Sequence, residues 1–142
     1  MNFKSRFCVL EQPKCASASL LVLRLVAGLA FVIHGFGKIQ NPMSWMGPEA
    51  SVPGVLQALA AISEFGGGLS WMAGLLMPLA SLGILCTMTV AVSTHIFVMG
   101  DPFVSTGGGA YELAAVYLSL AIMFIFVGPG CFSLDAKLFR KT

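Results

Sequence analysis

The sequence predicts an all-α membrane protein built as a bundle of four transmembrane helices. Composition supplies the first two observations. Hydrophobic residues make up 57% of the 142 residues and charged residues only 10%, whereas about 25% are charged in ordinary globular proteins. The mean hydropathy is +0.89. A soluble domain could not cover its surface with so few charges, so a disordered chain, a nucleic-acid binder and a cytosolic enzyme are excluded as first interpretations.

The third observation is the grouping of apolar residues into four long segments. A bilayer core about 30 Å thick requires about 20 mostly apolar residues in a spanning helix. The segments cover residues 19–37, 55–77, 79–99 and 111–127. None alternates with a period of two, as the strands of a membrane barrel do. We therefore expect a helical transmembrane domain over residues 19–130, because only helices and closed barrels satisfy the backbone in lipid.

Prolines and glycines mark the connections between the four spans. The breaks are Pro42, Pro48 and Pro53, then Pro78, then Pro102 with residues 107–109, and finally residues 128–130. These residues do not continue a helix cheaply. Because Pro78 alone separates the second span from the third, we expect a tight turn there.

Positive charge predicts the orientation of the bundle. The N-terminal tail, residues 1–18, and the C-terminal tail, residues 131–142, each carry three basic residues: Lys4, Arg6 and Lys14, and Lys137, Arg140 and Lys141. The first connection has only Lys38, and the third has none. Positive flanks stay cytoplasmic. Both tails are therefore expected at the cytoplasmic face, which requires an even number of spans.

Every predicted span contains an ionisable residue. They are Arg24 and His34, then Glu64, then His95, then Glu112, with Lys38 and Asp101 at outer ends. Such a residue costs about 2.5 to 3.5 kcal/mol at mid-membrane and marks a functional site by default. We expect the polar stripes of the helices, including one through Glu64 and Trp71 and one through Glu112 and Ser119, to converge inside the bundle.

Depth along the helices predicts a pocket that opens toward the outer leaflet. His34, His95 and Glu112 lie at the outer ends of three different spans, whereas Glu64 lies roughly 14 Å further in. Glu64 would form the floor of this pocket, with Arg24 as a further candidate. Alternatively, Arg24 neutralises Glu64 and joins two helices.

Two ligand alternatives use the same side chains. His34 and His95 on two helices are of the right type for the axial ligands of a haem b. The same two residues with Glu112 and Glu64 are of the right type for a metal ion. Neither spacing is specific, so haem b is not the leading expectation and no metal is assigned.

Three segments resemble one known family. They are RLVAGLAFVIHGFGKI (24–39), SEFGGGLSWMAGLL (63–76) and YELAAVYLSLAIMFIFVGPGCFSLDAKL (111–138). Together they resemble the DoxX family of small bacterial membrane proteins, named after a subunit of a thiosulfate:quinone oxidoreductase. The resemblance implies four helices, a place in the bacterial inner (plasma) membrane and an association with membrane redox complexes. Cys131 stands where that family often has Arg.

The leading functional hypothesis is a redox-associated subunit with a quinone or quinol site in the outer half of the bundle. A carboxylate and an imidazole suit the proton transfers of quinone reduction, and an apolar slot suits the ring and tail. We predict His34, His95 and Glu112 as the catalytic proton relay. We predict Glu64, Trp71, Lys38 and Arg24 as the quinone pocket or a structural ion pair.

Membrane lipid and a redox partner protein are the expected partners. The chain has no flavin or cluster motif, so a partner would have to supply electrons. No nucleic-acid partner is expected. Two other classes stay open: a non-enzymatic scaffold or assembly subunit of a membrane complex, and a small-solute or proton pathway.

Overall fold

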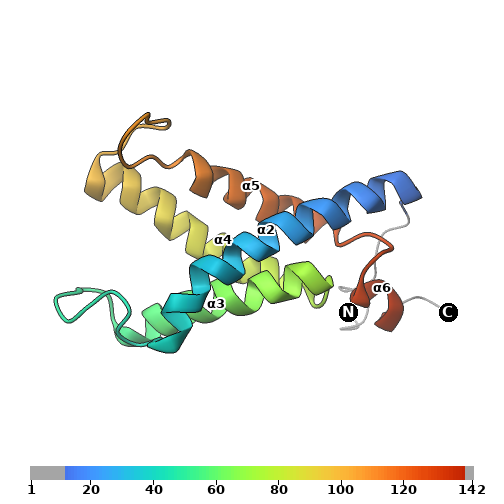
Figure 1. Cartoon of the computed structure of the whole chain (residues 1–142), viewed down its shortest axis with the longest axis horizontal. Coiled ribbons are helices and arrows are strands. Elements are labelled where there is room, and N and C mark those ends of the chain that lie inside the picture. The colour runs from blue at the N-terminus through green and yellow to red at the C-terminus, as the bar shows by residue number, and fades with distance from the viewer. Residues whose placement is uncertain (1–11, 140–142) are drawn as a thin grey trace.

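The computed structural model describes residues 12–139, and within them the fold is entirely helical (Figure 1). The helices are α2 (Lys14–Gln40), α3 (Gly54–Ala73), α4 (Met77–Thr94), the π-helical turn η1 (His95–Met99), α5 (Glu112–Val127) and α6 (Leu134–Leu138). The basic residues Lys4, Arg6, Arg140 and Lys141, which support the predicted orientation, lie outside the described residues.

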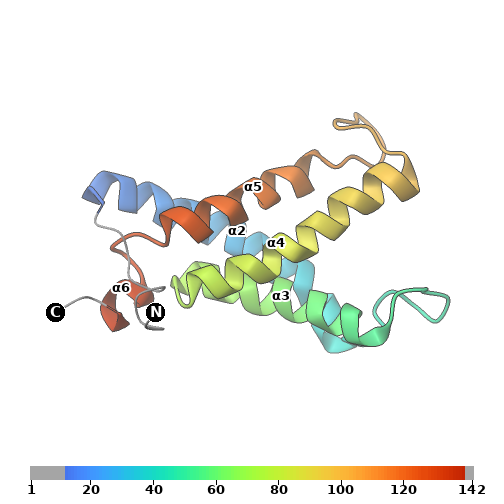
Figure 2. The same ribbon diagram turned by 180° about the vertical axis from the view of Figure 1, so that it is seen from behind.

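The four long helices form two antiparallel hairpins, α2 with α3 and α4 with α5 (Figures 1 and 2). One end of the molecule, here called the α6 end, holds the start of α2, the α3–α4 turn and α6. The other, here called the loop end, holds the connections 41–53 and 100–111. The two hairpins pack together near the α6 end and diverge toward the loop end in both views.

The observed helices overlap the four predicted segments, and their bounds differ most at the start of α2 and the end of α3. α2 begins at Lys14, directly after Pro13, so residues 14–18 are helical. α3 ends at Ala73 instead of residue 77, because Gly74 and Leu76 both adopt left-handed backbone conformations. The α3–α4 turn is tight, as expected from Pro78, which lies in the first turn of α4.

Glycines bring α2 and α3 into close contact. A Cβ on Gly28 would lie 2.7 Å from the Gly68 carbonyl oxygen, and a Cβ on Gly35 would lie 2.5 Å from the Phe65 nitrogen. Small residues allow backbones to approach in this way. Gly68 therefore serves this close packing. Gly66 does not, because a Cβ there would meet nothing within 4 Å.

The core is centred on Trp71, which is fully buried. Its ring packs edge-on against Phe31 at 5.4 Å and Phe124 at 4.8 Å between centroids. Its Nε1 donates a hydrogen bond to Ser81 Oγ at 3.0 Å. This one side chain therefore contacts residues of α2, α4 and α5.

Among the described residues, two helical stretches are long and apolar enough to cross a membrane: Lys14–Gln40 and Met77–Met99. α5 is apolar but has only 16 residues, or about 24 Å of helix. α3 is long enough, but its glycines, Gln57 and Glu64 lower its hydropathy. Length and composition thus support membrane insertion and leave the number of spans as a prediction.

Candidate functional site

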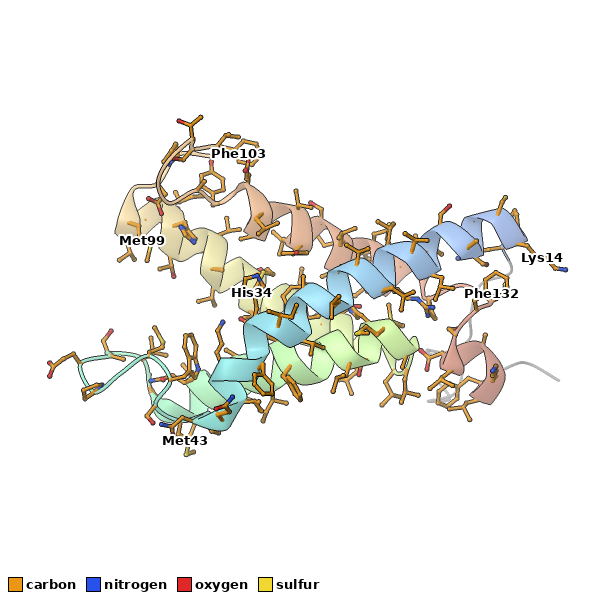
Figure 3. All side chains as sticks on the ribbon, viewed as in Figure 1. Lys14, His34, Met43, Met99, Phe103 and Phe132 are labelled. Atoms are coloured by element: carbon orange, nitrogen blue, oxygen red, sulfur yellow. The ribbon has the colours of Figure 1, made fainter. Side chains whose placement is uncertain are left out.

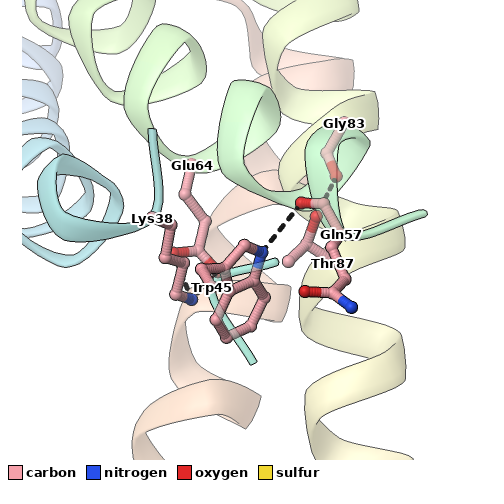
Figure 4. Close-up of polar contacts among 6 residues, drawn as sticks. All are labelled: Lys38, Trp45, Gln57, Glu64, Gly83 and Thr87. Atoms are coloured by element: carbon pink, nitrogen blue, oxygen red, sulfur yellow. Dashed lines mark hydrogen bonds and ion pairs between the residues drawn. The ribbon is translucent and has the colours of Figure 1, made fainter. Parts of the chain in front are cut away.

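Lys38 and Glu64 form an ion pair at the loop end of the α2–α3 hairpin (Figure 4). Lys38 Nζ lies 2.6 Å from both carboxylate oxygens of Glu64. Glu64 is 5% exposed in its side chain and Lys38 is 25% exposed. The contact at Gly35 and Phe65 fixes the register of the hairpin, and Lys38 lies about one turn further along α2.

The connection 41–53 folds over this ion pair. The Trp45 ring centroid lies 4.5 Å from Lys38 Nζ, a distance at which a cation is attracted to an aromatic face. Trp45 Nε1 donates to the Gln57 carbonyl oxygen at 3.0 Å (Figure 4). The buried Gln57 side chain holds the same loop, accepting from Met46 N–H at 3.1 Å and donating to the Val52 carbonyl at 2.8 Å.

The predicted pairing of Arg24 with Glu64 is wrong. Gly28 lies beside Gly68 and Gly35 beside Phe65, so antiparallel partners on α2 and α3 have numbers that sum to about 100. Arg24 is therefore opposite the end of α3, about ten residues, or about 15 Å, from Glu64. Glu64 binds Lys38 instead. Arg24 Nη2 donates to the Phe132 carbonyl at 2.6 Å.

His34 is exposed and has no hydrogen-bond or ion-pair partner within the described part of the chain. It lies one helical turn before Lys38 on α2. Figure 3 shows it close to where the two hairpins begin to diverge. His34 is therefore an accessible imidazole one turn from the Lys38–Glu64 ion pair; Lys38, Glu64, Trp45 and His34 are here called the loop-end group.

His95 and Glu112 lie on the other hairpin. His95 Nδ1 is 2.6 Å from Asp101 Oδ2, and Asp101 N–H donates to the His95 carbonyl at 2.9 Å. Glu112, at the start of α5, is exposed. No hydrogen bond or ion pair within residues 12–139 joins any two of His34, His95 and Glu112. That these three residues form a proton relay stays a prediction.

The expectation that the polar stripes converge holds for α3 and fails for α5. Gln57, Glu64 and Trp71 of the α3 stripe are buried. Glu112 and Ser119 of the α5 stripe are exposed. The core instead receives Ala121 and Phe124 from α5. Ser119 does not need a partner from another helix, because its hydroxyl donates to the Ala115 carbonyl at 2.9 Å.

Two further features bear on ligand binding. Among residues 12–139, no group of three His, Cys, Asp or Glu side chains is placed to hold a metal ion. An open, mostly apolar groove of about 420 Å³ runs between α3 and α4, lined in part by Ser63, Gly66, Gly83 and Cys86. None of the predicted site residues lines it.

Trp71 and Arg24, both predicted for the pocket, lie elsewhere. Trp71 is in the core and Arg24 is fully buried toward the α6 end. Sequence reasoning missed Trp45 as a partner of Lys38 and Asp135 as a partner of Arg24. Gln57 was expected on the same stripe of α3 as Glu64, and it is buried there.

Comparison with known proteins decides the family. The DoxX family profile matches residues 19–99. The chain belongs to the DoxX family. A protein of Haemophilus influenzae described as uncharacterised is 31% identical over 124 residues, covering 86% of this chain and 92% of the relative. The Inner membrane protein YqjF of Escherichia coli K12 is 30% identical over 145 residues, covering 90% of this chain and 98% of the relative.

No solved structure matches this chain. The family match and the apolar helices together identify a DoxX-family membrane protein. The sequence-based expectation of this family is confirmed.

Proposed function

We propose that this DoxX protein is a four-span subunit of a membrane redox complex in the bacterial inner membrane, with a quinone or quinol site at its loop end. The observation that carries the proposal is the group formed by Lys38, Glu64, Trp45 and His34, of which His34 has no hydrogen-bond partner within residues 12–139. Lys38 lies in the last turn of α2, and Figure 3 shows His34 close to where the two hairpins begin to diverge.

Topology supports four spans with both tails on the cytoplasmic side. The start of α2 and α6 lie at the same end of the bundle, and both long connections lie at the other. The exposed Lys14 and Lys137 belong to the α6 end, which suits a cytoplasmic face. The loop end then faces outward. The name of the Escherichia coli relative supports an inner-membrane location.

The chemistry of the loop-end group suits a quinone ring. Quinone carbonyls accept hydrogen bonds, and Lys38 and His34 supply donors one helical turn apart. The Trp45 ring offers an aromatic face. Reduction to the quinol adds two electrons, supplied by the redox partner protein, and one proton to each carbonyl oxygen. His34 and Glu64 are of the right type to deliver these protons.

In this proposal, His95 and Glu112 transfer protons from the outer surface and do not form the quinone pocket. His95 is hydrogen-bonded to Asp101 within its own hairpin, and Glu112 is exposed at the start of α5. They would pass protons from the outer surface toward the ring and would not themselves be its first contacts.

The test is quinone binding to the purified full-length protein in mild detergent. A short-chain quinone should quench the fluorescence of Trp45, and the Trp45→Phe variant should lose that response while Trp71 remains. His34→Ala should weaken quinone binding at least about tenfold, which corresponds to one hydrogen bond to a charged or polar group. Because His34 has no partner in the described chain, this variant should fold normally.

Glu49→Gln is the matched control, since Glu49 is exposed on the same connection. It should bind quinone as the unmodified protein does. If the unmodified protein shows no saturable quinone response, or if His34→Ala binds as tightly as Glu49→Gln, the quinone site is rejected.

A second candidate is a non-enzymatic scaffold or assembly subunit. It is favoured by one observation: Lys38–Glu64 and His95–Asp101 are each neutralised within the chain, so both pairs also suit a purely structural role. Purification from native membranes separates the two proposals. A stable partner protein without any quinone response supports the scaffold. The structure gives no comparable observation for a small-solute pathway.

A further inference from the structure

We propose that Arg24 and the N-terminus of α4 form a carboxylate-binding site, which the chain fills with its own Asp135. Through this contact, residues 128–139, the segment that follows α5, hold the two hairpins together. This segment is here called the clasp. It lies at the α6 end, away from the proposed quinone site (Figure 1). The inference does not depend on the proposed function.

Asp135 occupies the N-terminus of α4 with both carboxylate oxygens. Leu76 N–H donates to Oδ1 at 2.7 Å, and Met77 N–H donates to Oδ2 at 2.9 Å. The Asp135 side chain is fully buried. Free N–H groups and the helix dipole make the N-terminus of a helix as long as α4 a natural anion site. The anion here belongs to the chain itself.

Arg24 provides a second, independent reason for an anion at this place. Its side chain is fully buried, and within the described residues only Nη2 has a hydrogen-bond partner, the Phe132 carbonyl at 2.6 Å. Nε and Nη1 have none. A buried guanidinium with unused donors requires a compensating negative charge nearby. Asp135 is close enough to interact electrostatically with Arg24.

Backbone strain in the α3–α4 turn also points to Asp135. Leu76 has φ +49° and is the only non-glycine residue in the described chain with a positive φ. Residues with a Cβ rarely adopt this conformation. The N–H of Leu76 is one of the two groups that Asp135 binds. The carboxylate therefore holds the turn in a conformation that its sequence disfavours.

The same segment makes contacts with three other parts of the chain. Asp135 N–H donates to the Gly74 carbonyl at 2.9 Å, and Cys131 N–H donates to Ser17 Oγ at 3.1 Å. With the Arg24–Phe132 contact, the clasp binds α2, the end of α3 and the start of α4. It is also covalently continuous with α5. The clasp thus joins both hairpins at the α6 end.

The residues that cap α4 and interact with Arg24 follow all four long helices in the sequence. When they are undocked, the site made by Arg24 and the N-terminus of α4 can accept another carboxylate. This property makes the clasp testable by chemical rescue.

The experiment uses full-length Asp135→Ala in mild detergent, with trypsin cleavage after Lys137 as the readout. Lys137 lies in α6 and its side chain is exposed, so cleavage there reports how often the clasp opens. We expect cleavage at least about tenfold faster than in the unmodified protein. Sodium formate should slow this cleavage, and sodium chloride at the same ionic strength should not.

Two further variants distinguish a carboxylate site from general loosening. Asp135→Asn keeps the shape but loses the charge, so it should cleave faster than the unmodified protein. Leu76→Gly relieves the left-handed strain, so the double variant with Asp135→Ala should recover part of the protection. The double variant also replaces Asp135→Ala in the formate test if the single variant does not fold.

Glu49→Gln, which removes an exposed carboxylate on the loop connection, should change nothing. Two results would overturn the proposal. One is an Asp135→Asn protein as well protected as the unmodified one. The other is formate acting no better than chloride on a folded variant that lacks the Asp135 carboxylate.

Discussion

The two ends of the bundle neutralise their charges in opposite ways. At the α6 end, Arg24 of α2 contacts Phe132 and interacts with Asp135, which lie more than a hundred residues further along the chain. At the loop end, Lys38 pairs with Glu64 inside one hairpin, and His95 pairs with Asp101 inside the other. The first arrangement crosses between hairpins and the second does not.

This difference parallels the shape of the molecule. The clasp contacts both hairpins at the α6 end. The ion pairs at the loop end each lie within one hairpin and make no contact between the two. Figure 2 shows that the hairpins diverge toward the loop end.

The largest expected effect comes from breaking the closed end. Arg24→Leu removes the hydrogen bond to the Phe132 carbonyl and the buried positive charge that interacts with Asp135, so it should cost about 3 kcal/mol or more of unfolding free energy. Unfolding in mixed detergent micelles, followed by circular dichroism, measures this loss. Ser19→Ala serves as the control, because Ser19 is exposed on the same helix and bonds only the Cys15 carbonyl. A loss for Arg24→Leu no larger than for Ser19→Ala contradicts the comparison.

The helices were predictable from sequence because lipid leaves few alternatives. Runs of about 20 apolar residues predict the long helices, and Pro78 indicates the α3–α4 turn. Glu64 was correctly expected on an inward stripe with Trp71, because helical periodicity alone places both on one face.

The charge partners were not predictable in the same way. Periodicity gives the face of a residue but not the register between two helices. Register depends on where glycines let the two backbones approach, here Gly28 against Gly68 and Gly35 against Phe65. That register moves Arg24 away from Glu64 and brings Lys38 to it. The partners of Arg24, Phe132 and Asp135, follow the last apolar segment. Helical periodicity within the apolar segments therefore does not point to them.

A smaller effect is expected from the Lys38–Glu64 pair. Glu64→Gln keeps the side-chain shape and removes the charge, and should cost about 1–3 kcal/mol because its hydrogen bonds to the cation weaken. Lys38→Met with Glu64→Gln should cost less than the sum of the two single changes, because the two groups are in direct contact. Strictly additive losses in the same unfolding assay would show that the pair does not stabilise the hairpin.

Proteolysis tests which part of the protein the Glu64→Gln change destabilises. Glu64→Gln should loosen the connection 41–53, which folds over Lys38 through Trp45. It should leave trypsin cleavage after Lys137 unchanged, because the clasp shares no contact with this pair. Faster cleavage after Lys137 would mean that the two ends are coupled and that the comparison overstates their independence.

The smallest effect is expected from His95 and Asp101. Both side chains are partly exposed, 29% for His95 and 19% for Asp101, and exposed pairs contribute about 0–1 kcal/mol. Asp101→Asn retains the shape, an oxygen acceptor and the backbone bond from residue 101 to the His95 carbonyl. We therefore expect a loss of under about 1 kcal/mol in unfolding free energy, with no change in cleavage after Lys137.

His34→Asn is the control for altering polar groups at the loop end, since His34 has no partner among the described residues. A loss as large as that of Arg24→Leu would show that the connection 100–111 also holds the hairpins together, and that the open end depends on it.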